Sequence, residues 1–305
     1  MTRSNRRLAL AAAAIVLLAG CTTPPAEPAP TNHPTTTNPT VTSSPTPKDP
    51  GFAALEQEFG ARLGVFALDT GSGRTLEHRA DGRFAFASTY KALAAAAVLD
   101  SGADLDRVVT YSAADLVAYS PVTGNHVGTG MTLGDLAEAA ITVSDNTAGN
   151  LLLDELGGPA GFERDLRALG DDVTQADREE PGVNDVRPGD DRDTTSPRAF
   201  GRDLQAYALG DALDPDDRAQ LVEWLQRTTT GDDQIRAGVP AGWVVGHKTG
   251  HAGVYGNQND VAVLWPADGR APWVLVVFSD RPEPDAESDD ALIARAAGLV
   301  VTGWN

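Results

Sequence analysis

From residue 51 onward, the hydrophobic and polar positions alternate between a strand-like and a helix-like period. Two short apolar runs flank the turn-forming sequence Gly-Ser-Gly at residues 71–73, and together they predict a β-hairpin. Three longer apolar runs follow one another after residue 242. The pattern therefore predicts five strands, at residues 63–70, 74–79, 243–250, 260–266 and 272–279.

Most of the remaining apolar positions recur with helical spacing. The run at residues 87–99 is apolar on all sides, which predicts a helix buried between layers. Thr132 is a suitable N-cap for a later helix, and Gly157 with Gly158 ends another. The predicted helices cover residues 52–59, 87–99, 132–139, 146–156, 162–169, 197–209, 216–227 and 288–303.

This order of elements predicts an α/β plus all-α fold. We expect residues 51–305 to form one folded domain with two lobes. Residues 51–82 and 228–305 build an antiparallel sheet lobe from both ends, and residues 83–227 form an inserted helical lobe. Because ligand sites commonly lie between such lobes, we expect the functional residues at this interface.

The first 50 residues have a different composition and predict an export signal followed by a tether. Residues 1–20 join three arginines to an apolar stretch that is too short to span a bilayer, as in a signal peptide. Leu-Ala-Gly-Cys at residues 18–21 resembles a bacterial lipoprotein cleavage box, which would make Cys21 a lipidated, membrane-anchoring residue. Simple secretion is the alternative. Residues 21–50, rich in Thr and Pro, predict an extended spacer.

Charge and cysteine content narrow the possible functions. The formal net charge of −19 argues against a nucleic-acid partner, because phosphate binding needs a basic surface. Cys21 is the only cysteine, so an intrachain disulfide cannot form. The five histidines are scattered and no Cys-x-x-Cys pair occurs, so we expect no metal and no cofactor.

The distribution of lysine points to chemistry at two positions. Only three of the 24 basic residues are lysines, and Lys91 and Lys248 are the two in the folded part. Arginine stays protonated, whereas a buried lysine changes its pKa readily and can act as a base. Ser88 lies one helical turn before Lys91, close enough for the amine to activate its hydroxyl.

Two further short motifs follow in the chain. Ser144-Asp145-Asn146 precedes a predicted helix, and a simple helix cap is an alternative explanation for it. Lys248-Thr249-Gly250 lies in a predicted strand. The alternative for its lysine is a charge that keeps an edge strand from pairing with other chains. Each motif is weak alone, but the three in this order resemble the set of the penicillin-recognising serine enzymes.

Residues 177–197 add a fourth motif, and with it the chain resembles a class A serine β-lactamase from about residue 52 to its end. The segment is similar to the omega loop of that family, with Glu180 before Pro181 and Asn184 four residues later. Arg178 and Asp193 would close the loop as an ion pair. The Glu180–Pro181 bond is a candidate cis peptide.

The resemblance implies hydrolysis of β-lactam antibiotics through an acyl-enzyme on Ser88. Either Lys91, or Glu180 through a water, would take the serine proton, and Ser144 would relay a proton to the leaving nitrogen. Glu180 and Asn184 would activate the water that releases the product.

The same resemblance implies a set of substrate-binding residues. Lys248, followed by Thr249 and Gly250, would attract the substrate carboxylate, and Asn146 would hold its side-chain amide. The backbone N–H of His251, with that of Ser88, would form the oxyanion hole. Tyr119 would line the entrance, unless it is an ordinary surface tyrosine.

Some positions depart from the family pattern. Members usually place an arginine near the carboxylate site, whereas the aligned positions here hold Gln234, Gln258 and Asp289. We therefore expect modest substrate affinity. His251 replaces a small or hydroxyl-bearing residue, and its ring either narrows the pocket or points to solvent.

Two other functions share these motifs. A D-Ala-D-Ala carboxypeptidase or transpeptidase would use Ser88, Lys91, Ser144 and Lys248, and a non-catalytic penicillin-binding lipoprotein would keep only the fold. Glu180 favours the hydrolase, because penicillin-binding proteins lack the loop that carries it. We expect an extracytoplasmic, lipid-anchored monomer.

Overall fold

The structure is a computed structural model that describes residues 51–304. The predicted signal peptide, the tether and Cys21 lie outside the described residues. Within residues 51–304, no helix is both long enough and apolar enough to cross a membrane.

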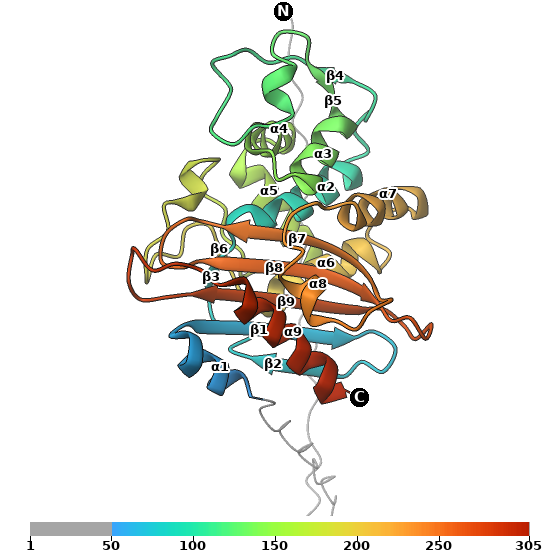
Figure 1. Ribbon diagram of the computed structural model, residues 1–305. Coiled ribbons are helices and arrows are strands. Elements are labelled where there is room, and N and C mark those ends of the chain that lie inside the picture. Colours follow the sequence, from blue (N-terminus) through green and yellow to red (C-terminus); the bar gives the residue numbers. More distant parts are fainter. Residues whose placement is uncertain (1–50, 305) are drawn as a thin grey trace, which may run out of the picture. The chain divides into compact units, whose positions relative to one another are not determined.

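Both ends of the described chain contribute to one antiparallel sheet of five strands, in the order β2-β1-β9-β8-β7 (Figure 1). The five strands expected from the sequence are confirmed, with boundaries shifted by at most two residues. They are β1 (Arg62–Asp69), β2 (Thr75–His78), β7 (Val244–His251), β8 (Gln258–Trp265) and β9 (Trp273–Asp280).

Four two-residue strands, too short for a periodicity to predict, form two further ladders. They are β3 (Phe84–Ala85) with β6 (Thr194–Thr195), and β4 (Val108–Val109) with β5 (Met131–Thr132). The first ladder is important for the site, because it joins the segment before Ser88 to the end of the loop that carries Glu180.

Helices cover both faces of the sheet and fill the region beyond β7 (Figure 1). The α-helices are α1 (Phe52–Phe59), α2 (Tyr90–Asp100), α3 (Leu133–Thr142), α4 (Asn146–Leu156), α5 (Pro159–Leu169), α6 (Pro197–Ala208), α7 (Pro215–Gln226), α8 (Ile235–Gly238) and α9 (Asp290–Trp304). Single 3-10 turns are η1 (Ala87–Thr89), η2 (Thr123–Asn125) and η3 (Gly182–Asn184).

The central strands have apolar side chains on both faces, because each face has its own helical cover. Along β9, Val274, Val276 and Phe278 belong to the core shared with α2 and α6, whereas Leu275 and Val277 belong to the core under α1 and α9. This alternation between two cores explains the continuous hydrophobic run in the sequence. The antiparallel sheet and its helical partner confirm the predicted fold class.

The helix predicted over residues 87–99 is divided in the structure. Residues 87–89 form the 3-10 turn η1, and the α-helix begins only at Tyr90. The division follows from Ala87, whose φ of 44° is incompatible with a right-handed helix. The rest of the prediction holds, since every α2 residue from Tyr90 to Leu99 is buried.

A pair of buried carboxyl groups should make stability depend on pH. Asp203 of α6 and Asp171, two residues after α5, are 3% and 6% exposed. Burial, followed by the charge of Asp171, raises the pKa of Asp203 to about 9, and Arg167 opposes this only in part. The folded state therefore favours protonated Asp203 over a range in which the unfolded chain ionises it.

The stability that this raised pKa contributes is fully present below the unfolded pKa and is lost as pH rises towards 9. We expect Asp203→Asn to remove this slope, which amounts to at most about 1.4 kcal/mol per pH unit. Urea unfolding at pH 5 and pH 8 measures the effect. Equal pH dependence in the two proteins would show that Asp203 ionises freely in the folded state.

Candidate active site

Ser88 lies on a strained turn at the start of α2. The preceding Ala87 has a positive φ, as do Tyr119, Ser144 and Asp193, all of which flank the same site. Left-handed backbone at non-glycine residues is unfavourable and persists only where the surrounding structure imposes it. Its concentration here indicates that the side chains of this region are held in fixed directions.

Lys91 is completely buried, and its ammonium group contacts four oxygens of the site. Its Nζ donates to Ser88 Oγ at 2.9 Å, to Asn146 Oδ1 at 2.6 Å and to the Ser144 carbonyl at 3.1 Å, and lies 3.0 Å from Glu180 Oε1. Burial lowers the pKa of Lys91 despite the opposing charge of Glu180. A buried amine with a lowered pKa suits a base beside a hydroxyl.

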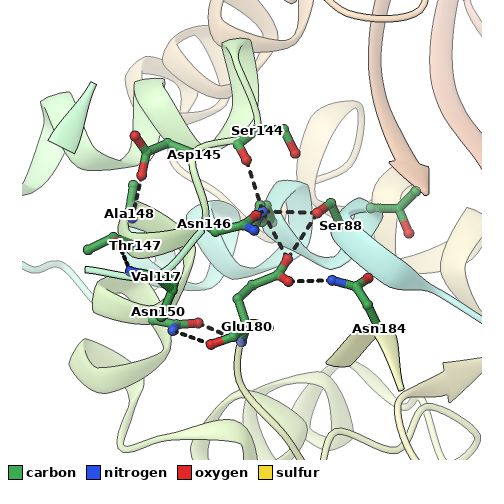
Figure 2. A network of polar contacts seen from close by, with 12 residues as sticks. Ser88, Val117, Ser144, Asp145, Asn146, Thr147, Ala148, Asn150, Glu180 and Asn184 are labelled. Atoms are coloured by element: carbon green, nitrogen blue, oxygen red, sulfur yellow. Dashed lines mark hydrogen bonds and ion pairs between the residues drawn. The ribbon is translucent and has the colours of Figure 1, made fainter. Parts of the chain in front are cut away.

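Glu180 contacts the same serine and lies next to Lys91, so the three side chains form a triangle of close contacts (Figure 2). Ser88 Oγ donates to Glu180 Oε1 at 3.0 Å, and Asn184 Nδ2 donates to Glu180 Oε2 at 2.6 Å. The carboxylate therefore reaches the serine through a direct hydrogen bond, where the sequence analysis expected contact through a water. Ser88, Lys91, Glu180 and Asn184 form one connected network.

The backbone of Glu180 is fixed by a residue that the sequence analysis did not select. The side chain of Asn150, on α4, accepts from Glu180 N–H and donates to the Glu180 carbonyl, both at 2.8 Å. Asn150 follows Asn146 by one helical turn, so both amides leave the same face of α4. In the sequence, this i, i+4 pair of asparagines is the feature that could have indicated Asn150 as a site residue.

The loop that carries Glu180 is closed by the expected ion pair between Arg178 and Asp193. The buried Asp193 carboxylate also accepts from the backbone N–H groups of Asp177 and Arg178. The Glu180–Pro181 bond is cis, as the resemblance implied. These contacts connect the start and the end of the loop close to Ser88.

Ser144 and Lys248 form a second pair beside Lys91. Lys248 Nζ donates to Ser144 Oγ at 2.9 Å and is completely buried. Burial, and next the charge of Lys91, lower the pKa of Lys248 well below its usual value. Asp145, the residue after Ser144, is buried and caps α4. The motif therefore both caps a helix and directs Ser144 towards Lys248.

Strand β7 carries Lys248, Thr249 and Gly250 against the turn of Ser88. A Cβ on Gly250 would lie 2.8 Å from the Phe86 carbonyl oxygen, so only glycine permits this approach. The His251 side chain is exposed, and its Nε2 lies 3.4 Å from Ser288 Oγ. The alternative in which this ring lies at the solvent boundary agrees with its position.

The first histidine on β7 has a different environment. His247 and His251 are four residues apart. On a helix this spacing could bring two metal ligands together, but both residues lie on an extended strand, which separates their side chains along its length. His247 is buried, with Nδ1 3.0 Å from the Asp260 carboxylate.

Asn146 and Tyr119 lie at the outer side of the site. Asn146 Nδ2 donates to the Ala118 carbonyl, while its Oδ1 accepts from Lys91. Tyr119 is 62% exposed, and its carbonyl accepts from the backbone of Asn146. The structure therefore places Tyr119 beside the network with its ring accessible to a ligand.

Two amides that the sequence comparison placed near the expected carboxylate site share one carboxylate partner. Gln234 and Gln258 both donate to the side chain of Asp290. The acidic residue in contact with both amides is thus Asp290, whereas the carboxylate of Asp289 turns back to accept from Ala291 N–H at the start of α9.

Comparison with known proteins agrees with this geometry. The Beta-lactamase enzyme family matches residues 51–304. The chain is 57% identical to a β-lactamase of Amycolatopsis lactamdurans over 263 residues, 84% of this chain and 86% of that one. It is 52% identical to β-lactamase FAR-1 of Nocardia farcinica over 307 residues, 99% and 96% of the two chains.

Solved structures give the same result. A β-lactamase from Desulfarculus baarsii superposes with a TM-score of 0.82 at 50% identity, covering 83% of this chain and 96% of that one. A class A β-lactamase from Clostridium kluyveri gives the same TM-score at 42% identity, covering 84% and 98%. The chain therefore belongs to the β-lactamase enzyme family, as a class A enzyme that hydrolyses β-lactams.

Proposed function

We propose that Ser88 carries β-lactam hydrolysis in this enzyme, with Lys91 as the base of acylation and Glu180 as the base of deacylation. The observation that supports this most is the convergence on Ser88 Oγ, which lies 2.9 Å from Lys91 Nζ and 3.0 Å from Glu180 Oε1. One hydroxyl is thus in contact with two groups that can exchange a proton.

Acylation requires the neutral amine of Lys91, whose Nζ lies 3.0 Å from Glu180 Oε1. Burial favours that neutral form of Lys91. Ser88 Oγ then attacks the β-lactam carbonyl carbon while its proton passes to Lys91. The lactam C–N bond breaks, and the nitrogen receives a proton through Ser144.

The position of Ser144 supports its part in this relay. Its hydroxyl is held by Lys248 at 2.9 Å, and its carbonyl is bound by Lys91 at 3.1 Å. The negative charge on the substrate carbonyl oxygen is stabilised by the backbone N–H groups of Ser88 and His251.

Deacylation uses the contact between the same serine and Glu180. Once Ser88 Oγ is esterified it has no proton to donate, and a water becomes the donor to Glu180. Glu180 accepts one proton of this water, whose oxygen forms a bond to the ester carbonyl carbon. The Oγ–C bond breaks and Ser88 regains a proton. Asn184 orients Glu180 through its 2.6 Å hydrogen bond and helps to position the water.

The substrate binds along β7 and between the segments that carry Asn146 and Asn184. Lys248, Thr249 and Gly250 face the substrate carboxylate, Asn146 binds the side-chain amide, and Tyr119 packs at the entrance. The described residues of this region offer only one buried ammonium, Lys248, besides Lys91.

Ser88→Ala tests the proposal directly. We expect loss of turnover of a chromogenic cephalosporin and loss of the covalent adduct in mass spectra, because the attacking oxygen is absent. Ser72→Ala, on the exposed hairpin turn, should leave both unchanged. A stoichiometric burst without continued turnover in the unmodified protein would instead indicate a penicillin-binding protein.

Gln258→Arg should increase the affinity for the substrate carboxylate. The new guanidinium would lie beside Asp290 and near β7, where it can form a charge-assisted hydrogen bond. We expect KM for benzylpenicillin to fall by about tenfold, equal to about 1.4 kcal/mol of binding free energy. Gln258→Met is the neutral control, and an equal decrease in KM for both variants would contradict the electrostatic explanation.

The cellular location follows from the same sequence features. Bacterial β-lactamases such as those named above typically act outside the cytoplasm. We propose that Cys21 carries a lipid that anchors the enzyme to the outer face of the cell membrane, with residues 21–50 as a spacer and a monomeric catalytic domain. The support is the single cysteine at the end of Leu-Ala-Gly-Cys.

A further inference from the structure

A cavity of about 690 Å³ lies where β1 begins and β9 ends, against residues 186–192 of the loop that carries Glu180. None of the proposed catalytic residues lines it. Its wall contains six arginines and four carboxylates, although the whole chain has a formal net charge of −19. The arginines are Arg62, Arg79, Arg83, Arg187, Arg192 and Arg281.

Three of these arginines are neutralised by close carboxylates. Arg62 pairs with Asp280, Arg79 with Glu56, and Arg192 with Asp190. Such pairs leave little positive potential for a ligand.

Two others are poorly neutralised. Arg83 Nε lies 3.9 Å from the exposed Asp191, at the limit of an ion pair. Arg281 is 9% exposed, and the one hydrogen bond described for its guanidinium joins Nη1 to the Gly256 carbonyl at 3.1 Å. Among residues 51–304, no carboxylate lies within ion-pair distance of Arg281. A buried guanidinium without a counter-charge favours an anionic ligand.

The fold gives Arg281 a fixed place. A Cβ on Gly256 would lie 2.6 Å from Arg281 Nη1, and Gly256 has a positive φ of 51°. Glycine therefore lets the guanidinium pack directly against the loop backbone, with its remaining N–H groups available at the cavity wall.

The same wall contains an unpaired acceptor. Asn257, 1% exposed, donates through Nδ2 to the Ala85 carbonyl at 3.2 Å, but its buried Oδ1 has no hydrogen-bond partner among the described residues. A buried acceptor of this kind is unfavourable until a donor reaches it. Oδ1 is buried beneath the wall, so a ligand reaches it only through a small rotation of the Asn257 side chain, and that ligand must carry a hydrogen-bond donor as well as negative charge.

We propose that this cavity is a binding site for inorganic phosphate. Hydrogen phosphate combines both properties, because its charged oxygens accept from Arg281 and Arg83 while its P–OH group donates to Asn257 Oδ1. Sulfate has a similar size and charge but no proton at neutral pH, so it leaves Asn257 Oδ1 unpaired. The site is thus selective for phosphate over sulfate.

Bound phosphate would connect three segments near the catalytic network. Arg281 follows β9, Arg83 precedes β3, and residues 186–192 of the loop complete the wall. Ala85 and Thr194, which both line the cavity, are paired partners in the β3–β6 ladder. A ligand there stabilises the folded state, because it binds that state and not the unfolded chain.

Thermal unfolding in 20 mM phosphate and in sulfate of equal ionic strength tests the proposal without any variant. We expect phosphate to raise Tm by about 3 °C relative to sulfate, as for a ligand with millimolar affinity. Isothermal titration with phosphate should give saturable binding of one equivalent. Equal Tm values in the two salts, or no saturable heat, would overturn the proposal.

Arg281→Gln assigns the site, with Arg74→Gln on the exposed hairpin as a control that removes the same charge. The phosphate–sulfate difference should disappear in Arg281→Gln and persist in Arg74→Gln. Because each variant is compared with itself in two salts, its own basal stability cancels. Should Arg281→Gln not fold, the exposed Arg187→Gln, also on the wall, should lower phosphate affinity several-fold. If these wall variants keep the full Tm difference between phosphate and sulfate, phosphate binds elsewhere.

Discussion

Replacing Glu180 with glutamine is expected to stop the enzyme after acylation and to trap the drug on Ser88. The amide can still accept from Asn184 Nδ2 and can donate to Ser88 Oγ in place of accepting from it, but it cannot accept a proton from water. Without its carboxylate partner, buried Lys91 shifts further towards the neutral amine, so acylation continues. We expect deacylation to slow by about 10³-fold, within the range for loss of a general base.

Mass spectrometry after mixing with benzylpenicillin measures this result as a persistent adduct, and stopped-flow absorbance measures it as a burst of one equivalent. Glu179→Gln is the matched control, since it removes the neighbouring, exposed carboxylate from the same loop. That variant should turn over normally. Normal turnover in Glu180→Gln itself, without an adduct, would refute the assignment of the deacylation base.

Replacing Lys91 with methionine should have the opposite kinetic signature, with slow acylation and little accumulated adduct. Methionine fills the buried space but removes the amine that contacts Ser88 at 2.9 Å. We expect the acylation rate to fall by about 10³-fold. In the unmodified enzyme this rate should rise as pH increases through the lowered pKa of Lys91, because only the neutral amine accepts a proton.

The pH profile distinguishes loss of the base from a general disturbance of the site. In Lys91→Met the remaining acylation should lose this acid limb, whereas a merely distorted site would keep it at a lower rate. Circular dichroism checks that the variant is folded. Acylation at the normal rate and with the normal profile would assign the serine proton to Glu180, which is also in direct contact with Ser88.

The parts of the fold that the sequence predicted well are those with a long, uniform burial pattern. β8 and β9 are buried on both faces, and their continuous apolar runs located them within two residues. By contrast, α8 spans four residues and is too short to establish a period. The lobe boundaries stay a prediction.

The main error in the fold came from backbone geometry that composition conceals. Alanine is a strong helix former, so residues 87–99 appeared to form one helix, yet Ala87 adopts a left-handed conformation. Tertiary contacts impose this conformation, and the turn η1 then presents Ser88 to Lys91. Local propensity cannot reveal such a constraint.

The candidate site residues came from motifs, and the structure brings most of them together around Ser88. Asn150 escaped notice because an asparagine within a helix has many ordinary roles, and only the folded loop shows which backbone it binds. For the acidic residue near the carboxylate region, the sequence indicated Asp289, whereas in the structure Asp290 contacts the glutamines. The irregular segment after β9 decides which of the two side chains turns inward.

The clamp formed by Asn150 also bears on how this enzyme can diversify. The main chain of Glu180 is attached to α4, a rigid helix, rather than depending only on its own loop. The outer residues of that loop can therefore acquire insertions or new side chains while the carboxylate of Glu180 keeps its position. Drug range can change under antibiotic selection at the loop's rim, with the reaction centre inherited intact.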